Sequence, residues 1–205
     1  MDATTIRHDT TERHVAKYAN KNPIHRLSLG RFHDLVAETV REVAPSSILD
    51  FGCGEGFVLD ELSERGVSLK GYEGLDLRED ALAAARSRWP EQRFTCANLF
   101  DGALDERRYD MVMSLEVLEH LFEPEKALER LVTLCSGKLL LTVPNEPWFQ
   151  LANLARGRDF IRLGNHPEHI NHWNAKTFAA FVGEHARVIN VKTRFPFVIL
   201  LAEPK

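Results

Sequence analysis

Acidic and imidazole side chains gather in two short segments of the sequence. Glu116, Glu119 and His120 are spaced three and one positions apart, so they share one face if this segment forms a helical turn. A second segment carries three histidines, at His166, His169 and His172. Histidine has the unperturbed pKa closest to neutral pH, which suits a general base. We therefore expect His120 and His169 to be base candidates, with Glu116 and Glu119 beside them.

The same side chains allow a second chemistry, because two carboxylates and two imidazoles can hold a divalent metal ion that activates a hydroxyl group. Its ligands would be Glu116, Glu119, His120 and His169. Our first interpretation uses no metal. A hydrogen-bonded, purely structural histidine stays open for His120, and we favour that role for His166 and His172.

Glycines alternate with other residues in Gly52-Cys53-Gly54-Glu55-Gly56, directly after the apolar run 48–51. Alternate glycines let the backbone approach a ligand closely at a helix N-terminus. A dinucleotide-binding G-x-G-x-x-G pattern requires glycine at position 57, which is Phe57. Asp76 ends the next predicted strand, where a carboxylate can accept both hydroxyls of a ribose. The alternatives are a tight strand-to-helix turn for the loop and a helix N-cap for Asp76.

Apolar periodicity along the chain predicts alternating strands and helices. The strands are expected at 47–51, 70–75, 94–96, 109–114, 138–143, 187–192 and 197–202, and the helices at 32–43, 57–65 and 80–89, from Pro124 onward, and after Asn174 as N-cap. This alternation predicts an α/β fold with a seven-stranded, mainly parallel sheet, a C-terminal antiparallel hairpin and helices on both faces. The active crevice is expected beyond the carboxyl ends of the strands.

The length and composition bound the class of protein. A chain of 205 residues suits a single domain over 1–205, with a flexible arm at 1–20 and an insertion or lid at 145–173. The net charge of -4 makes nucleic acid an improbable partner. Cys53, Cys96 and Cys135 show no pairing pattern, and no stretch is long and apolar enough to span a membrane, so we expect a cytoplasmic protein.

At this point the chain resembles the class I S-adenosylmethionine-dependent methyltransferases. The resemblance covers about residues 30–202 and is carried by the loop Asp50-Phe51-Gly52-Cys53-Gly54-Glu55-Gly56, by Gly74-Leu75-Asp76, and by the segments 94–98, 109–121 and 137–145. It implies a Rossmann-like methyltransferase fold with S-adenosyl-L-methionine as cofactor. The cofactor-binding residues it implies are Asp50, Gly52, Cys53, Gly54, Gly56, Asp76, Leu77, Asn98, Leu99, Ser114 and Leu115. The chain departs from the family at Asn98, where a carboxylate usually contacts the adenine.

The resemblance implies methyl transfer, which we expect to be O-methylation of a small molecule by in-line displacement. Holding the acceptor close to the methyl group supplies much of the acceleration, and a histidine base assists. An anionic or glycosidic acceptor would be bound by three arginines and the aromatic residues among them: Arg156, Arg158, Arg162, Trp148, Phe149 and Phe160. Loop arginines in contact only with water, and aromatic residues that anchor the insertion, are the alternatives.

Two other functions stay open. The E-x-x-E-H turn at 116–120 is similar to that of metal-dependent small-RNA 3′-terminal 2′-O-methyltransferases, which add a histidine from a later H-x-D-H-type segment; here Glu168 replaces that Asp. The net charge speaks against this reading. The third possibility is a non-catalytic S-adenosylmethionine-binding module. The sequence does not fix the oligomeric state.

Overall fold

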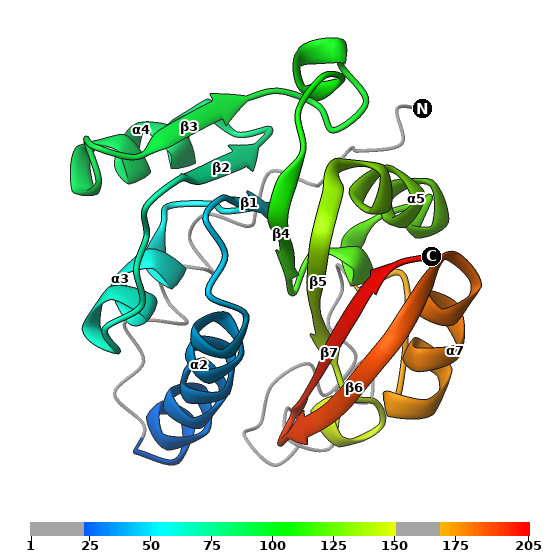
Figure 1. Ribbon diagram of the computed structural model, residues 1–205. Coiled ribbons are helices and arrows are strands. Elements are labelled where there is room, and N and C mark those ends of the chain that lie inside the picture. The colour runs from blue at the N-terminus through cyan, green and yellow to red at the C-terminus, as the bar shows by residue number, and fades with distance from the viewer. Residues whose placement is uncertain (1–22, 151–168) are drawn as a thin grey trace.

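A seven-stranded sheet forms the centre of the molecule in the computed structural model, which describes residues 23–150 and 169–205 (Figure 1). The strands are β1 (Ile48–Phe51), β2 (Tyr72–Asp76), β3 (Arg93–Cys96), β4 (Tyr109–Leu115), β5 (Cys135–Pro144), β6 (Ala186–Arg194) and β7 (Phe197–Pro204). Their order is β3-β2-β1-β4-β5-β7-β6. The first five are parallel, whereas β7 runs antiparallel to β5 and to β6. The predicted Rossmann-like fold with a C-terminal hairpin is confirmed.

Helices cover both faces of this sheet. One face carries α2 (Pro23–Val43), α3 (Phe57–Glu64) and α4 (Glu79–Arg88), and the other carries α5 (Pro124–Leu134) and α7 (Ala175–His185). Neighbouring residues of β5 belong to opposite cores, with Leu139 and Leu141 facing α5 and Leu140 facing α2. A strand buried on both faces needs an uninterrupted apolar run, which explains why these strands show no polar alternation.

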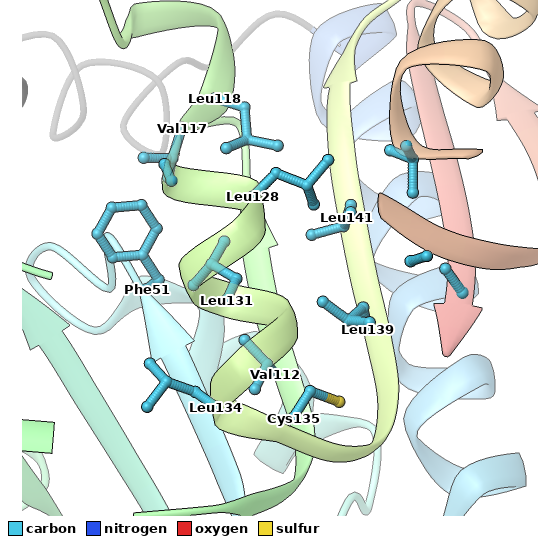
Figure 2. Packing of buried hydrophobic residues seen from close by; sticks show 14 of the residues in the cluster. Phe51, Val112, Val117, Leu118, Leu128, Leu131, Leu134, Cys135, Leu139 and Leu141 are labelled. Carbon is cyan, nitrogen blue, oxygen red and sulfur yellow. The ribbon is translucent and has the colours of Figure 1, made fainter. Parts of the chain in front are cut away.

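The core under α5 also anchors the chain that follows β4. Leu128, Leu131 and Leu134 are spaced to share one side of α5, and they pack on the sheet (Figure 2). Val117 and Leu118 lie at the end of this cluster nearest Phe51, as Figure 2 shows. They precede and begin the short 3₁₀ turn η2 (Leu118–His120), so apolar packing fixes the turn that carries Glu119 and His120.

Several boundaries differ from the predicted ones. Helix α2 begins at Pro23 rather than near residue 32, because proline is tolerated in the first turn of a helix. Strand β5 begins at Cys135, immediately after α5. A second 3₁₀ turn, η1 (Gly102–Leu104), precedes β4. The expected N-cap is confirmed: the Asn174 side chain accepts from the amides of Lys176 and Thr177.

The expected arm at 1–20 lies outside the described residues, and the expected insertion is described only at 145–150 and 169–173. The three cysteines are unpaired, as the sequence predicts. Among the described helices, none combines the length and apolar character needed to cross a bilayer.

Candidate cofactor and acceptor site

The glycine loop joins β1 to α3 in a conformation that requires glycine. Gly52, Gly54 and Gly56 have positive φ angles of 80°, 54° and 77°. A Cβ atom on Gly52 would lie 2.5 Å from Val117 Cγ2, so position 52 has no room for a side chain. The Gly52 amide donates to the Leu75 carbonyl at 2.7 Å, which ties the loop to the end of β2. The loop is therefore a shaped backbone surface at the carboxyl edge of the sheet.

Asp76 closes β2 beside this loop. Its Oδ2 accepts a hydrogen bond from the Gly54 amide, and its Oδ1 accepts one from the Arg78 amide, both at 2.9 Å. Helix α4 begins at Glu79 with Arg78 at the N-cap position, so the alternative interpretation of Asp76 as the N-cap is wrong. The carboxylate is held against the loop on one side and is 8% exposed.

A partly buried arginine supports this arrangement, and the sequence analysis missed it. Arg78 Nη2 lies 3.3 Å from Glu55 Oε1, and Arg78 Nε lies 3.6 Å from Asp76 Oδ1. Both carboxylates are buried, so the guanidinium offsets part of the cost of burying their charges. Only the charge of Arg78 just after the G-x-D segment would have hinted at this role.

The end of β1 contributes a third buried carboxylate, that of Asp50. Tyr72 donates a hydrogen bond of 2.7 Å from its hydroxyl to Asp50 Oδ2. Burial raises the pKa of Asp50 to about 6, the bond from Tyr72 opposes that rise, and the nearby charge of Asp76 adds to it.

Asn98 and its neighbours form the loop after β3. Asn98 Oδ1 accepts from the Phe100 amide, and the Asn98 amide donates to Asp101 Oδ2, both at 3.0 Å. Leu99, a predicted cofactor residue, is fully buried in the core. Leu77 is partly exposed beside the same edge. The backbone and the side chain of Asn98 thus both hold the shape of this loop. The resemblance to the methyltransferases, which implied an adenine contact for Asn98, did not predict this role.

The acceptor side of the site contains a compact group of three side chains, Glu119, His120 and His169. Their potential ligand atoms all lie within 4.8 Å of one another. The two imidazole rings meet edge to face with centroids 5.0 Å apart, and His120 Nε2 lies 3.8 Å from Glu119 Oε1. Glu119 is buried, whereas both histidines are half-buried. The structure therefore brings together three of the four side chains predicted for this chemistry.

Glu116 does not join them. It has a positive φ of 61° and lies before the 3₁₀ turn, which contains only Leu118–His120. Its Oε1 accepts from Thr142 Oγ1 at 3.1 Å, and its amide donates to the same residue. The expectation that Glu116, Glu119 and His120 share one face of a helical turn is therefore wrong for Glu116, because β5 captures its side chain.

Backbone hydrogen bonds clamp the segment of His169 onto η2. The amides of Ile170 and Asn171 both donate to the Glu119 carbonyl, at 2.8 and 3.0 Å. The Asn171 side chain donates to the carbonyls of Leu118 and Leu121, at 3.2 and 2.6 Å. Asn171 is a positioning residue that sequence reasoning overlooked, since an asparagine between two histidines carries no pattern of its own.

The rest of the insertion is described only in part. Phe149 packs on the His169 ring with centroids 5.1 Å apart and touches the core, so it anchors the segment as the alternative reading proposed. Trp148 is 53% exposed. His172 Nδ1 lies 3.7 Å from Glu146 Oε1, and burial raises the pKa of Glu146. Outside the described residues lie Arg156, Arg158, Arg162, Phe160 and His166.

A family model described as a methyltransferase domain matches residues 15–185. The chain belongs to this family. Its fold and glycine loop are those that the resemblance to the class I S-adenosylmethionine-dependent methyltransferases implied.

The relatives of this methyltransferase act on different molecules. The small RNA 2′-O-methyltransferase of Arabidopsis thaliana is 33% identical over 120 residues, which cover 52% of this chain and 13% of that protein. The ubiquinone biosynthesis O-methyltransferase of Alkalilimnicola ehrlichii is 33% identical over 113 residues, which cover 52% of this chain and 43% of that protein. This chain thus spans less than half the length of either relative.

Solved structures show the same fold. The magnesium protoporphyrin IX methyltransferase of Synechocystis PCC 6803, with bound SAH, superposes with a TM-score of 0.69 at 19% identity, and covers 96% of this chain and 94% of its own.

The described residues fit the cofactor of this methyltransferase. Ser114, at the end of β4, is fully buried, and within the described part of the chain its hydroxyl has no hydrogen-bond partner. An orphaned hydroxyl is costly unless a ligand or water satisfies it. The closely packed Gly52 and the Asp76 carboxylate lie along the same edge. This edge therefore fits S-adenosylmethionine, for which the resemblance implies Asp76, Ser114 and Leu115 among the binding residues.

Proposed function

We propose that this methyltransferase methylates a hydroxyl group of a small-molecule acceptor, with His120 or His169 as the proton acceptor. The observation that carries this proposal is the compact group of Glu119, His120 and His169 next to the carboxyl end of β4. An oxygen nucleophile gains reactivity as it loses its proton, so a base at this place serves O-methylation directly.

S-adenosylmethionine, when bound, supplies the methyl group on a positively charged sulfur. The acceptor oxygen forms a bond to the methyl carbon while the carbon–sulfur bond breaks, and the electron pair of the carbon–sulfur bond stays on sulfur. The hydroxyl proton passes to the imidazole. Glu119, 3.8 Å from His120 Nε2, stabilises the imidazolium that results. The apolar surroundings of η2 exclude water from this transfer.

Exposed apolar side chains near this group favour an acceptor with an apolar part. Phe122 follows η2, Trp148 follows β5, and Ile170 is hydrogen-bonded to η2; all three are among the exposed large apolar residues. Such side chains beside a polar group are typical of small-molecule sites. The arginines expected to bind an anionic or glycosidic acceptor lie outside the described residues.

A turnover assay against a panel of phenols, catechols and alkyl gallates tests this proposal. At least one of the two variants His120→Gln and His169→Gln should lower kcat by ~10²-fold or more, while SAH binding stays unchanged in both. His185→Gln is the matched control, because His185 lies on α7 beside Glu125 and Glu129. Undiminished kcat in both variants and in their double variant would contradict the role of base.

The same group supports a second function, metal-dependent methylation of an RNA 3′ end. A carboxylate and two imidazoles within 4.8 Å suit a divalent ion, and the Arabidopsis relative is a small RNA 2′-O-methyltransferase. A metal ion there would lower the pKa of a coordinated hydroxyl. Glu119, His120 and His169 would hold it, and Glu116 would first have to leave Thr142.

Metal dependence separates the two functions. For the small-molecule function, turnover survives treatment with EDTA. For the RNA function, turnover requires added Mn²⁺ or Mg²⁺, occurs on an oligoribonucleotide and disappears when its terminal 2′-hydroxyl is replaced by hydrogen. Tight SAH binding with no transfer to either class of acceptor would instead indicate a non-catalytic binding module.

A further inference from the structure

Asp50 and Tyr72 form a buried pair on adjacent parallel strands. Asp50 lies in β1 two residues before Gly52, and Tyr72 begins β2. Ile48 is in register with Tyr72, so the tyrosine side chain reaches along the sheet toward the glycine loop to meet the Asp50 carboxylate at 2.7 Å. Both residues are almost completely buried. The pair therefore lies inside the wall of the cofactor site.

The groups around Asp50 leave its charge poorly compensated. Tyr72 and Asp76 face it from β2, and Cys53 faces it from the loop. Arg78, the nearest cation among these groups, pairs with Glu55 and Asp76 instead. In the described part of the chain, the Tyr72 hydroxyl is the only hydrogen-bond donor to the Asp50 carboxylate. Burial and Asp76 both disfavour the ionised form, and only the tyrosine hydroxyl favours it.

S-adenosylmethionine carries a positive charge that can compensate the negative charge of Asp50. Its methionine part ends in an ammonium group, and Asp76 is the carboxylate predicted for the ribose. A carboxylate in a low-dielectric wall attracts a cation more strongly than one in water. Because Asp50 immediately precedes the loop that the cofactor contacts, its charge acts on the amino-acid end of the ligand.

We propose that Tyr72 is a positioning residue for cofactor binding, which keeps Asp50 ionised beside the glycine loop so that its charge attracts the cofactor's ammonium group. The tyrosine does not touch the cofactor and acts through Asp50. This role is independent of which acceptor the enzyme methylates, because it concerns the cofactor alone.

The proposal predicts a pH dependence with a definite sign. The pKa of Asp50 is about 6, so the carboxylate takes up a proton below that pH and the attraction is lost. Removing the tyrosine hydroxyl removes the one contact that lowers this pKa. In Tyr72→Phe the loss of affinity should therefore begin at a higher pH, close to neutral.

Calorimetric titration of the full chain between pH 5 and 8.5 tests this, with two ligands. SAH carries the ammonium group, whereas 5′-methylthioadenosine has the same adenosine without the amino acid. In the unmodified protein, SAH affinity should fall below about pH 6, and methylthioadenosine affinity should stay level. In Tyr72→Phe, the SAH midpoint should move up by ~1 pH unit, weakening SAH by ~2-fold at pH 7 and by ~5-fold at pH 6 and sparing it at pH 8.5.

Two further variants complete the experiment. Asp50→Asn should bind SAH weakly at every pH and methylthioadenosine normally. Tyr109→Phe is the matched control, because Tyr109 is also buried and donates to a carboxylate, that of Glu73, away from the loop; its SAH profile should equal that of the unmodified protein. Parallel pH profiles of SAH and methylthioadenosine in the unmodified protein would overturn the proposal. So would an equal loss of both ligands at all pH values in Tyr72→Phe, which would indicate a purely structural role.

Discussion

The side-chain amide of Asn171 donates a hydrogen bond of 2.6 Å to the carbonyl oxygen of Leu121. The same amide donates to the Leu118 carbonyl, and the Asn171 backbone donates to the Glu119 carbonyl. One residue thus donates to three carbonyls in and just after η2. His169 precedes this clamp by two positions, so its distance from His120 depends on Asn171.

Replacing Asn171 with alanine should therefore lower turnover without weakening the cofactor. The substitution removes the two side-chain hydrogen bonds to the Leu118 and Leu121 carbonyls, so His169 loses part of what fixes its position. We expect kcat to fall by ~10-fold or more while the SAH Kd changes little, because misplaced catalytic groups are costly even at small displacements. Steady-state kinetics together with calorimetry check this.

Asn190→Ala is the control for Asn171→Ala, since Asn190 is exposed on β6. Unchanged kcat in Asn171→Ala, or an equal fall in the control, would show that the clamp does not position the site.

Replacing glycine with alanine should be harmful at Gly52 and favourable at Gly183. Gly52→Ala should abolish SAH binding, since its φ of 80° is strained for alanine and the new Cβ would lie 2.5 Å from Val117 Cγ2. Gly183→Ala, in α7, meets no atom within 4 Å and should stabilise the fold by ~0.5–1 kcal/mol. Thermal unfolding and SAH titration of both variants check the pair. SAH binding by Gly52→Ala at full affinity would refute the close approach of the loop.

The cofactor half of the site was predictable because its signals are local. The glycine loop, Asp76 and the strand ends that carry them lie within short stretches whose residue types dictate backbone shape, as the positive φ angles at Gly52, Gly54 and Gly56 show. Right-handed crossovers then restrict the possible strand orders. Local pattern plus topology was enough to bring these residues to one edge.

The acceptor half was predictable only in part, because its geometry depends on contacts between distant segments. Thr142 of β5 captures Glu116, and Asn171 clamps η2 from fifty positions away. The Tyr72–Asp50 pair likewise joins two strands. A helical spacing such as that of Glu116, Glu119 and His120 predicts a shared face only if the helix forms, and a left-handed residue at 116 prevents it.

The carboxylate of Glu61 in α3 pairs with His33 of α2 and predicts how the free energy of unfolding changes with pH. Glu61 Oε2 lies 3.0 Å from His33 Nδ1 and 2.7 Å from Arg65 Nη1, and the hydrogen bond with His33 is the largest cause that lowers the pKa of Glu61. Since the folded-state pKa lies below the ordinary 4.5, the stabilisation is present above that pH and is lost as the pH falls through the folded-state value.

Urea unfolding at pH 7 and at pH values down to 3.5 measures this effect. Glu61→Gln should be less stable than the unmodified protein at pH 7, and the difference should shrink in acid. Glu64→Gln, on the exposed side of α3, is the control and should follow the unmodified protein. A stability difference that is constant with pH would mean that Glu61 contributes by packing and not by charge.

Trp148 tests the apolar character proposed for the acceptor. Its side chain is exposed at the end of β5, next to Phe149, whose ring packs on His169. An indole in that position contributes binding area to an apolar acceptor in the ground state and in the transition state alike, so its loss should raise KM and leave kcat unchanged. With an octyl or dodecyl gallate as acceptor, we expect Trp148→Ala to raise KM by ~3–10-fold, and with methyl gallate much less. Ile189→Ala removes an exposed apolar side chain from the outer strand β6 and should alter neither value. An equal change in KM for the long and short esters would show that Trp148 does not contact the apolar part, and the acceptor class would then have to be sought among polar molecules.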